Sequence, residues 1–114
     1  MDSEELWKME ESFWLEGPAF YERSMALNAQ MVFPAPVGIL KGSKIVDGLR
    51  QAPRWESVEF DGRSEAELGN TVVLAYEATG RRNGQKPYAA LCTSTYVRLN
   101  NEWILLAHQQ TPKT

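Results

Sequence analysis

The stretch from residue 86 to residue 110 constrains the fold most, because it predicts two long strands joined by a tight turn at Asn100-Asn101. Asn tolerates the positive φ that two-residue hairpin turns need. Side chains on a strand alternate between the two faces of a sheet. Both alternating sets of the first strand are largely apolar: Ala89, Leu91, Thr93, Thr95, Val97 and Leu99, and Tyr88, Ala90, Cys92, Ser94, Tyr96 and Arg98. Such a sheet needs helices on one face and a second layer or a second subunit on the other.

The rest of the chain predicts helices first and strands afterwards. Apolar residues recur at helical spacing over residues 3–16, a short helix begins at Pro18, and a third helix spans residues 43–51. Strands are expected over residues 27–33 and 71–81, and residues 55–68 form either two short strands or one long strand with a bulge at Asp61-Gly62. This order predicts a single α+β domain over residues 1–114, a cone-shaped roll whose bent mixed or antiparallel sheet wraps around three N-terminal helices.

Composition and charge exclude several functional classes. The 114 residues carry a net charge of −3 with only 12 Lys and Arg, so no nucleic acid partner is expected. One cysteine and one histidine exclude an internal disulfide and the common Cys or His metal sites, and no phosphate-binding glycine motif is present, so no metal or cofactor is expected. The acidic start and the lack of an apolar run of ~20 residues predict a cytoplasmic protein without a membrane segment.

The closing residues carry a family resemblance. The ending N-N-E-W-I-L-L-A-H-Q-Q-T-P, preceded by Y-V-R-L, resembles the C-terminal hairpin of the SnoaL-like and ketosteroid-isomerase-like proteins of the nuclear-transport-factor-2-like superfamily. The segments F-W-L-E-G, M-V-F-P and G-S-K-I-V-D-G-L fall in that family's order, so the resemblance covers nearly the whole chain. It implies a cystatin-like cone with a ligand opening between helices and sheet, and it favours the single bulged strand over residues 55–68. This fold hosts isomerases, cyclases, hydratases and non-catalytic members.

The resemblance also implies that Phe33 and Thr95 point into the cone, and strand parity then predicts a mostly apolar pocket. Ile104, Leu106, His108 and Gln110 would share one face of the last strand. Such a lining suits a small lipophilic ligand with a carbonyl or hydroxyl group, although the same side chains could simply fill the core. The predicted pocket residues are Trp14, Tyr21, Phe33, Leu49, Tyr76, Thr95, His108 and Gln110.

Among these residues, His108 is the candidate for catalysis. Histidine titrates near neutral pH and could act as a general base, or it could be a structural residue hydrogen-bonded at the end of the sheet. Tyr76 and Thr95 could donate hydrogen bonds to a substrate oxygen or be ordinary strand residues. The glutamates of the first helix are expected on its solvated side, although Glu10 or Glu11 could turn inward.

The chain departs from the ketosteroid isomerases at the positions that carry their chemistry. Those enzymes have a carboxylate base at the end of the first strand, a tyrosine on the first helix and a protonated aspartate on the penultimate strand. Here the strand ends in Met31-Val32-Phe33-Pro34, the first helix has no tyrosine, and the aspartate's place falls near Thr95. A proton shuttle of that kind is therefore not expected.

The second face of the sheet would be a large apolar patch on a monomer, which predicts a homodimer packed sheet to sheet. The expected interface residues are Tyr88, Cys92, Tyr96 and Trp103, with Cys92 inert inside the interface. Three functions stay open at this point. They are a binding domain without catalysis, an isomerase, cyclase or hydratase acting on a lipophilic carbonyl compound through His108, and a purely structural dimerisation module.

Overall fold

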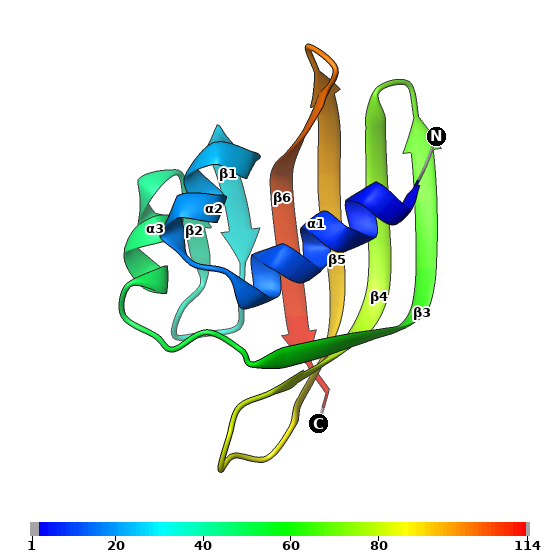
Figure 1. The fold of residues 1–114 in the computed structure, drawn as a ribbon. Helices are drawn as coiled ribbons and strands as arrows, with labels where there is room; N and C mark the ends of the chain where they lie inside the picture. Colours follow the sequence, from blue (N-terminus) through cyan, green and yellow to red (C-terminus); the bar gives the residue numbers. More distant parts are fainter. Residues whose placement is uncertain (1–2, 114) are drawn as a thin grey trace.

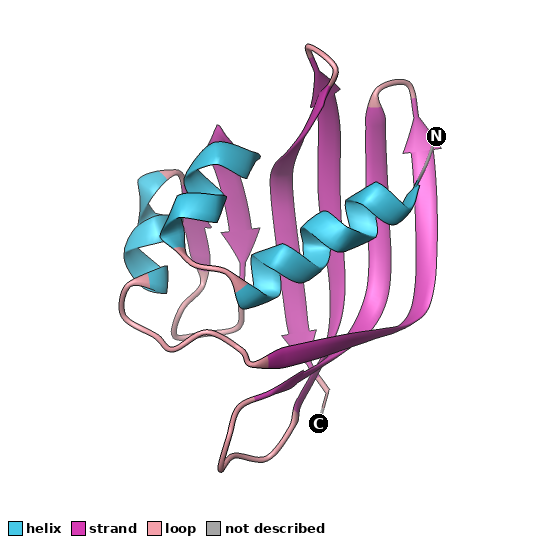
Figure 2. Cartoon of the chain, viewed as in Figure 1, coloured by secondary structure: helices cyan, strands magenta, loops and turns pink. Residues whose placement is uncertain are grey.

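The computed structural model describes residues 3–113, which form three helices and a six-stranded mixed sheet (Figures 1 and 2). The strand order is β2-β1-β6-β5-β4-β3, with β1 parallel to β6 and the other neighbours antiparallel. The α+β cone expected from the sequence is confirmed. The elements are α1 (Ser3–Leu15), α2 (Pro18–Ser24), β1 (Met25–Val32), β2 (Ile39–Lys41), α3 (Ser43–Leu49), β3 (Ser57–Leu68), β4 (Thr71–Arg81), β5 (Tyr88–Leu99) and β6 (Glu102–Pro112).

Turn residues and a bulge set the length and bend of the strands. Asn100 and Asn101, with φ of 51° and 65°, connect β5 to β6 as expected. Between Asp61 and Ser64 the register of β3 against β4 shifts, and Gly62 in this bulge has a φ of 61°. β3 is therefore one long bulged strand. The three-residue β2 was not expected, because so short a strand leaves no alternating pattern to detect.

Helix α1 crosses one face of the sheet, which we call the inner face; the opposite face is the outer face (Figure 1). Leu6, Trp7, Phe13 and Trp14 of α1 are buried against this face. The Trp7 and Tyr76 rings meet edge to face with their centroids 5.5 Å apart. Among residues 3–113, no helix has the length and apolar character needed to cross a membrane.

The faces of β5 are the reverse of those expected from the sequence. Cys92 and Tyr96 are buried on the inner face, Tyr88 is half-buried there, and Thr95 lies on the outer face. The expectation that Tyr88, Cys92 and Tyr96 form a dimer interface is therefore wrong. Both faces of β5 are apolar enough to be buried, so its own alternation could not indicate which one meets the helices.

A bulge in β6 changes the alternation within that strand. Thr95 pairs with Ala107 while Tyr96 pairs with Leu105, so Leu106 is the extra residue. Leu105 is consequently buried on the inner face together with His108, whereas Leu106 is exposed and not part of the pocket. Trp103 pairs with Arg98 and packs against the core, which also removes it from the predicted interface.

Two glycines should respond in opposite ways to substitution by alanine. A Cβ on Gly80 would lie 2.9 Å from the Trp55 ring, so we expect Gly80→Ala to cost about 1 to 3 kcal/mol of stability. A Cβ on Gly48 in α3 would meet only Leu40, at 3.7 Å, and Gly48→Ala should add about 0.5 kcal/mol through helix propensity. Urea denaturation of both variants measures the two changes in the free energy of unfolding. Destabilisation by Gly48→Ala would contradict the described packing around α3.

Candidate functional site

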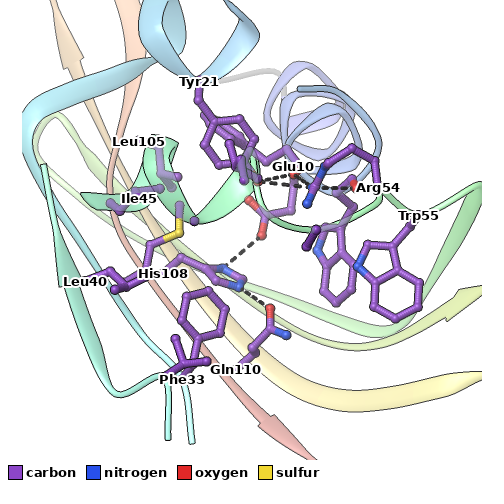
Figure 3. Close-up of a pocket in the computed structure, with 17 residues that line it drawn as sticks. Glu10, Tyr21, Phe33, Leu40, Ile45, Arg54, Trp55, Leu105, His108 and Gln110 are labelled. Carbon is purple, nitrogen blue, oxygen red and sulfur yellow. Dashed lines mark hydrogen bonds and ion pairs between the residues drawn. The ribbon is translucent and has the colours of Figure 1, made fainter. Parts of the chain in front are cut away.

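A cavity of about 270 Å³ opens between the three helices and the inner face at β1 and β6 (Figure 3). We call it the helix–sheet cavity. Apolar and aromatic side chains form most of its wall, and polar groups gather along α1 and at the end of β6. The residues that line it are Glu10, Phe13, Trp14, Tyr21, Met31, Phe33, Val37, Leu40, Ile45, Gly48, Leu49, Ala52, Arg54, Trp55, Leu105, His108 and Gln110.

Six of the eight pocket residues expected from the sequence lie in this wall: Trp14, Tyr21, Phe33, Leu49, His108 and Gln110. Tyr76 is not among the lining residues, although its hydroxyl reaches the same polar cluster by contacting Glu10 and Trp14. Thr95 is on the outer face and cannot reach the cavity, since β5 itself lies between them. The expected donor role of Thr95 is therefore wrong.

The most unusual group in the wall is Glu10, whose carboxylate sits on the buried side of α1 with 1% of its surface exposed. Four neighbours on the sheet surround it. The Tyr96 hydroxyl donates to Glu10 Oε1 at 2.6 Å, the Ser94 hydroxyl donates to Oε2 at 2.5 Å, and the Tyr76 hydroxyl also donates to Oε2. His108 Nδ1 lies 3.6 Å from Oε2. A buried carboxylate is tolerated because this set satisfies its oxygens.

The surrounding groups keep Glu10 ionised. Burial raises the pKa of the carboxyl, but the hydrogen bond and charge of His108 and the hydroxyls of Ser94 and Tyr76 outweigh it, so the pKa falls below its ordinary value of 4.5. Burial and the Glu10 charge raise the pKa of Tyr76 and of Tyr96. Both phenols therefore remain protonated and act as donors to the carboxylate.

His108 links this carboxylate to the cavity (Figure 3). Its Nδ1 lies 2.7 Å from the Ser94 hydroxyl, whose single hydrogen is donated to Glu10, so Nδ1 carries a proton. Its Nε2 lies 2.9 Å from Gln110 Oε1, an acceptor, while the Gln110 amide nitrogen donates to the Tyr88 hydroxyl. These hydrogen-bond partners assign a proton to each ring nitrogen, and the doubly protonated ring is linked to Glu10 through Ser94.

Arg54 secures the wall of the cavity on the helix side. Its guanidinium donates to the backbone carbonyls of Phe13, Trp14 and Glu16, at 2.7, 2.6 and 2.9 Å, where α1 ends. These carbonyls have no partner within the helix, and a cation at a helix C-terminus is favourable. The next residue, Trp55, stacks on Tyr88 with ring centroids 5.3 Å apart. The segment after α3 is thereby fixed against both α1 and the sheet.

Cys92 should be unreactive in the folded protein. Burial, followed by the charge of Glu10, raises the pKa of its thiol to about 12. We expect no labelling by a thiol-specific disulfide reagent near pH 8, at which a free thiol reacts readily, and one equivalent of labelling after unfolding in urea. Labelling of the native protein at the rate of a free thiol would contradict the placement of Cys92 on the inner face.

Several residues of the site were not predicted as part of it. The expectation that the α1 glutamates lie on its solvated side is wrong for Glu10, which turns inward, as the alternative allowed. Glu10 lies four residues after Leu6 and four before Trp14, on the same stripe as the buried apolar residues, and this spacing could have assigned it to the inner side. Ser94 follows once the correct face of β5 is known. Leu105 depends on the bulge, and no pattern in the sequence marks Arg54. Among residues 3–113, no group of three or more His, Cys, Asp or Glu side chains could hold a metal ion.

Comparison with known proteins assigns the fold. No family model matches the sequence, and no curated protein matches it either. Among solved structures, a candidate ketosteroid isomerase from Parabacteroides distasonis is similar over 100% of this chain and 89% of its own, with TM-score 0.85 and 15% identity. An NTF2-like protein of unknown function from Prochlorococcus sp. is similar over 100% of this chain and 94% of its own, with TM-score 0.82 and 15% identity.

The association domain of C. elegans CaMKII is similar over 93% of this chain and 88% of its own, with TM-score 0.75 and 11% identity. These likenesses show that the chain has the fold of the nuclear-transport-factor-2-like superfamily. At these levels of identity they assign the fold alone, and the function has to be argued from the helix–sheet cavity.

Proposed function

We propose that this protein binds a small, largely apolar molecule in the helix–sheet cavity. One observation carries the proposal: an apolar cavity of about 270 Å³ ends on a polar pair, His108 and Gln110, at one point of its wall. Small-molecule sites combine an apolar lining with few, fixed polar groups in this way. The volume corresponds to about nine water molecules of liquid, so a ligand of roughly ten non-hydrogen atoms fits. A steroid would have to extend out through the opening.

A thermal-shift screen tests this proposal with short fatty acids, small aromatic acids and alcohols, and steroids. A ligand that binds only the folded state raises the melting temperature. We expect shifts from the small probes that disappear in Gly48→Phe, because Gly48 lies in the cavity wall, and persist in the matched control Gly48→Ala. Absence of any shift across the set would reject the binding function and favour the structural dimerisation module.

We further propose that the protein is a homodimer joined through the outer face. Exposed apolar side chains lie there on β5, including Leu91 with 54% of its surface accessible and Leu99 with 49%, and Leu106 adds to them at the bulge of β6. A face of this kind favours association of a second copy. The likeness to the association domain of C. elegans CaMKII supports self-association through this fold.

Light scattering on wild type, Leu91→Lys and the control Arg81→Ala tests the dimer. Leu91 pairs across the outer face with Glu77 and Thr111, so a lysine there would place a charge in the proposed interface. Arg81 is exposed, and among residues 3–113 its ion-pair partner is Glu59 at 3.4 Å. We expect a dimer for wild type and control and a monomer for Leu91→Lys. A monomeric wild type at micromolar concentration would reject the proposal.

A second candidate function is isomerase, cyclase or hydratase chemistry on a lipophilic carbonyl compound, and the Glu10–Ser94–His108 chain favours it. The chain connects a buried carboxylate to a cavity-lining imidazole through 2.5 and 2.7 Å hydrogen bonds. Because Nε2 carries a proton, His108 would act first as a general acid toward a carbonyl oxygen, and it becomes a base only after losing that proton. Turnover that is lost in His108→Gln, with the fold retained, would support this role; unchanged turnover would reject it.

A further inference from the structure

The donor character of His108 restricts which ligand group can bind beside it. Gln110 Oε1 is hydrogen-bonded to His108 Nε2 at 2.9 Å, and both side chains line the helix–sheet cavity. A ligand that reaches His108 must replace this amide oxygen, so it must present a hydrogen-bond acceptor. A carboxylate is a stronger acceptor than a neutral amide toward a charged donor. An alcohol oxygen can also accept from Nε2–H, but it is neutral and gains less from the exchange, and an ammonium group has no lone pair to offer.

The charged residues in the cavity wall also favour a ligand that carries a carboxylate. Glu10, Arg54 and His108 are the lining residues that carry charge, and the Glu10 carboxylate is matched by His108 and enclosed by three hydroxyl donors. Arg54 binds backbone carbonyls and the Tyr21 hydroxyl, and within residues 3–113 it has no carboxylate partner. The C-terminal end of α1 offsets about half of this charge. The cavity therefore keeps a net positive charge.

We infer that the ligand of the helix–sheet cavity is a small apolar monocarboxylate, with its carboxylate on His108 Nε2 in place of the Gln110 amide and its apolar part against the aromatic wall. This inference rests on the proposed binding function. Phe33 and Trp14 flank the imidazole, with ring centroids 6.2 and 6.5 Å away, so an aryl or short alkyl chain attached to the carboxylate meets an apolar surface. The cavity volume limits the ligand to roughly ten non-hydrogen atoms.

Isothermal titration of the full chain with 3-phenylpropanoate and 3-phenylpropan-1-ol at neutral pH tests the inference, because the two probes differ only in the end group. We expect the acid to bind about tenfold more tightly than the alcohol, since the carboxylate pairs its negative charge with the charged donor, whereas the alcohol offers a neutral acceptor. An alcohol that binds as tightly as the acid overturns the inference and leaves the binding function intact. If neither probe binds, the binding function fails and the inference fails with it.

Two variants test whether the preference for the acid over the alcohol arises at His108. His108→Gln removes the charged donor, so the preference for the acid should fall to within about twofold while the alcohol keeps its affinity. Gln110→Ala removes the competing acceptor and should strengthen binding of the acid. Gln110→Ala also tests the inference if His108→Gln does not fold. Weaker binding of the acid to Gln110→Ala would contradict the replacement of the Gln110 amide by the carboxylate at His108 Nε2.

Discussion

Replacing Glu10 with alanine is expected to lower the free energy of unfolding by about 3 to 5 kcal/mol. The variant leaves the hydroxyls of Tyr76, Ser94 and Tyr96 without their acceptor and leaves the His108 cation without its carboxylate, all in the core. Urea denaturation near pH 7 measures the loss. Glu11→Ala is the matched control, because Glu11 is exposed on the same helix, and it should change stability by less than about 0.5 kcal/mol.

The same carboxylate should make stability depend on pH in a predictable direction. Because the pKa of Glu10 is lower in the folded protein, its stabilisation is fully present above the ordinary value of 4.5 and is lost as pH falls through the lower folded value. Wild type should therefore lose stability more steeply than Glu10→Gln below pH 4.5. Equal slopes for the two proteins would contradict an ionised, hydrogen-bonded Glu10.

Arg54→Ala should have the next largest effect, a loss of about 2 to 3 kcal/mol. Three backbone carbonyls at the end of α1 lose a charged donor, and the segment that forms one wall of the cavity loses its contact with α1. Arg54→Lys should restore only part of the loss, since an ammonium group cannot reproduce the planar set of donors. Urea denaturation of both variants provides the measurement.

Arg50→Ala is the control for this prediction. Arg50 also follows α3, but its ion pairs with Glu22 and Asp47 are 3.5 and 3.8 Å long and exposed to solvent. Its removal should cost less than about 1 kcal/mol. Similar losses for Arg50→Ala and Arg54→Ala would show that the carbonyl contacts of Arg54 do not hold the segment in place.

The architecture could be predicted from the sequence because its main signals are local. Helical spacing predicted α1, and the asparagine turn predicted the closing hairpin. Asp61-Gly62 indicated either a turn or a bulge, and the family resemblance favoured the bulge that β3 has. The faces of the sheet could not be assigned in the same way. β5 is apolar on both faces, and a one-residue bulge at Leu106 reverses the alternation of β6 in its middle.

The candidate site shows how an error in sheet faces propagates to function. Because the two faces of β5 were predicted the wrong way round, Ser94 and Tyr96 were placed outside the pocket. Glu10 then had no predicted partners, and no acid could be paired with His108. A glutamate on the buried stripe of α1 requires donors opposite it, and in the structure Ser94 and Tyr96 of β5 provide them. Thr93 and Thr95 on the other face also carry hydroxyl donors, so this requirement alone does not choose the face.

The central claim is that the helix–sheet cavity holds a small apolar ligand at His108, and a crystal structure of the protein with 3-phenylpropanoate tests it most directly. We expect the carboxylate within hydrogen-bonding distance of His108 Nε2, the Gln110 side chain moved away, and the phenyl ring between Phe33 and Trp14. A cavity closed by its own side chains, or a ligand bound only elsewhere on the surface, would contradict the account.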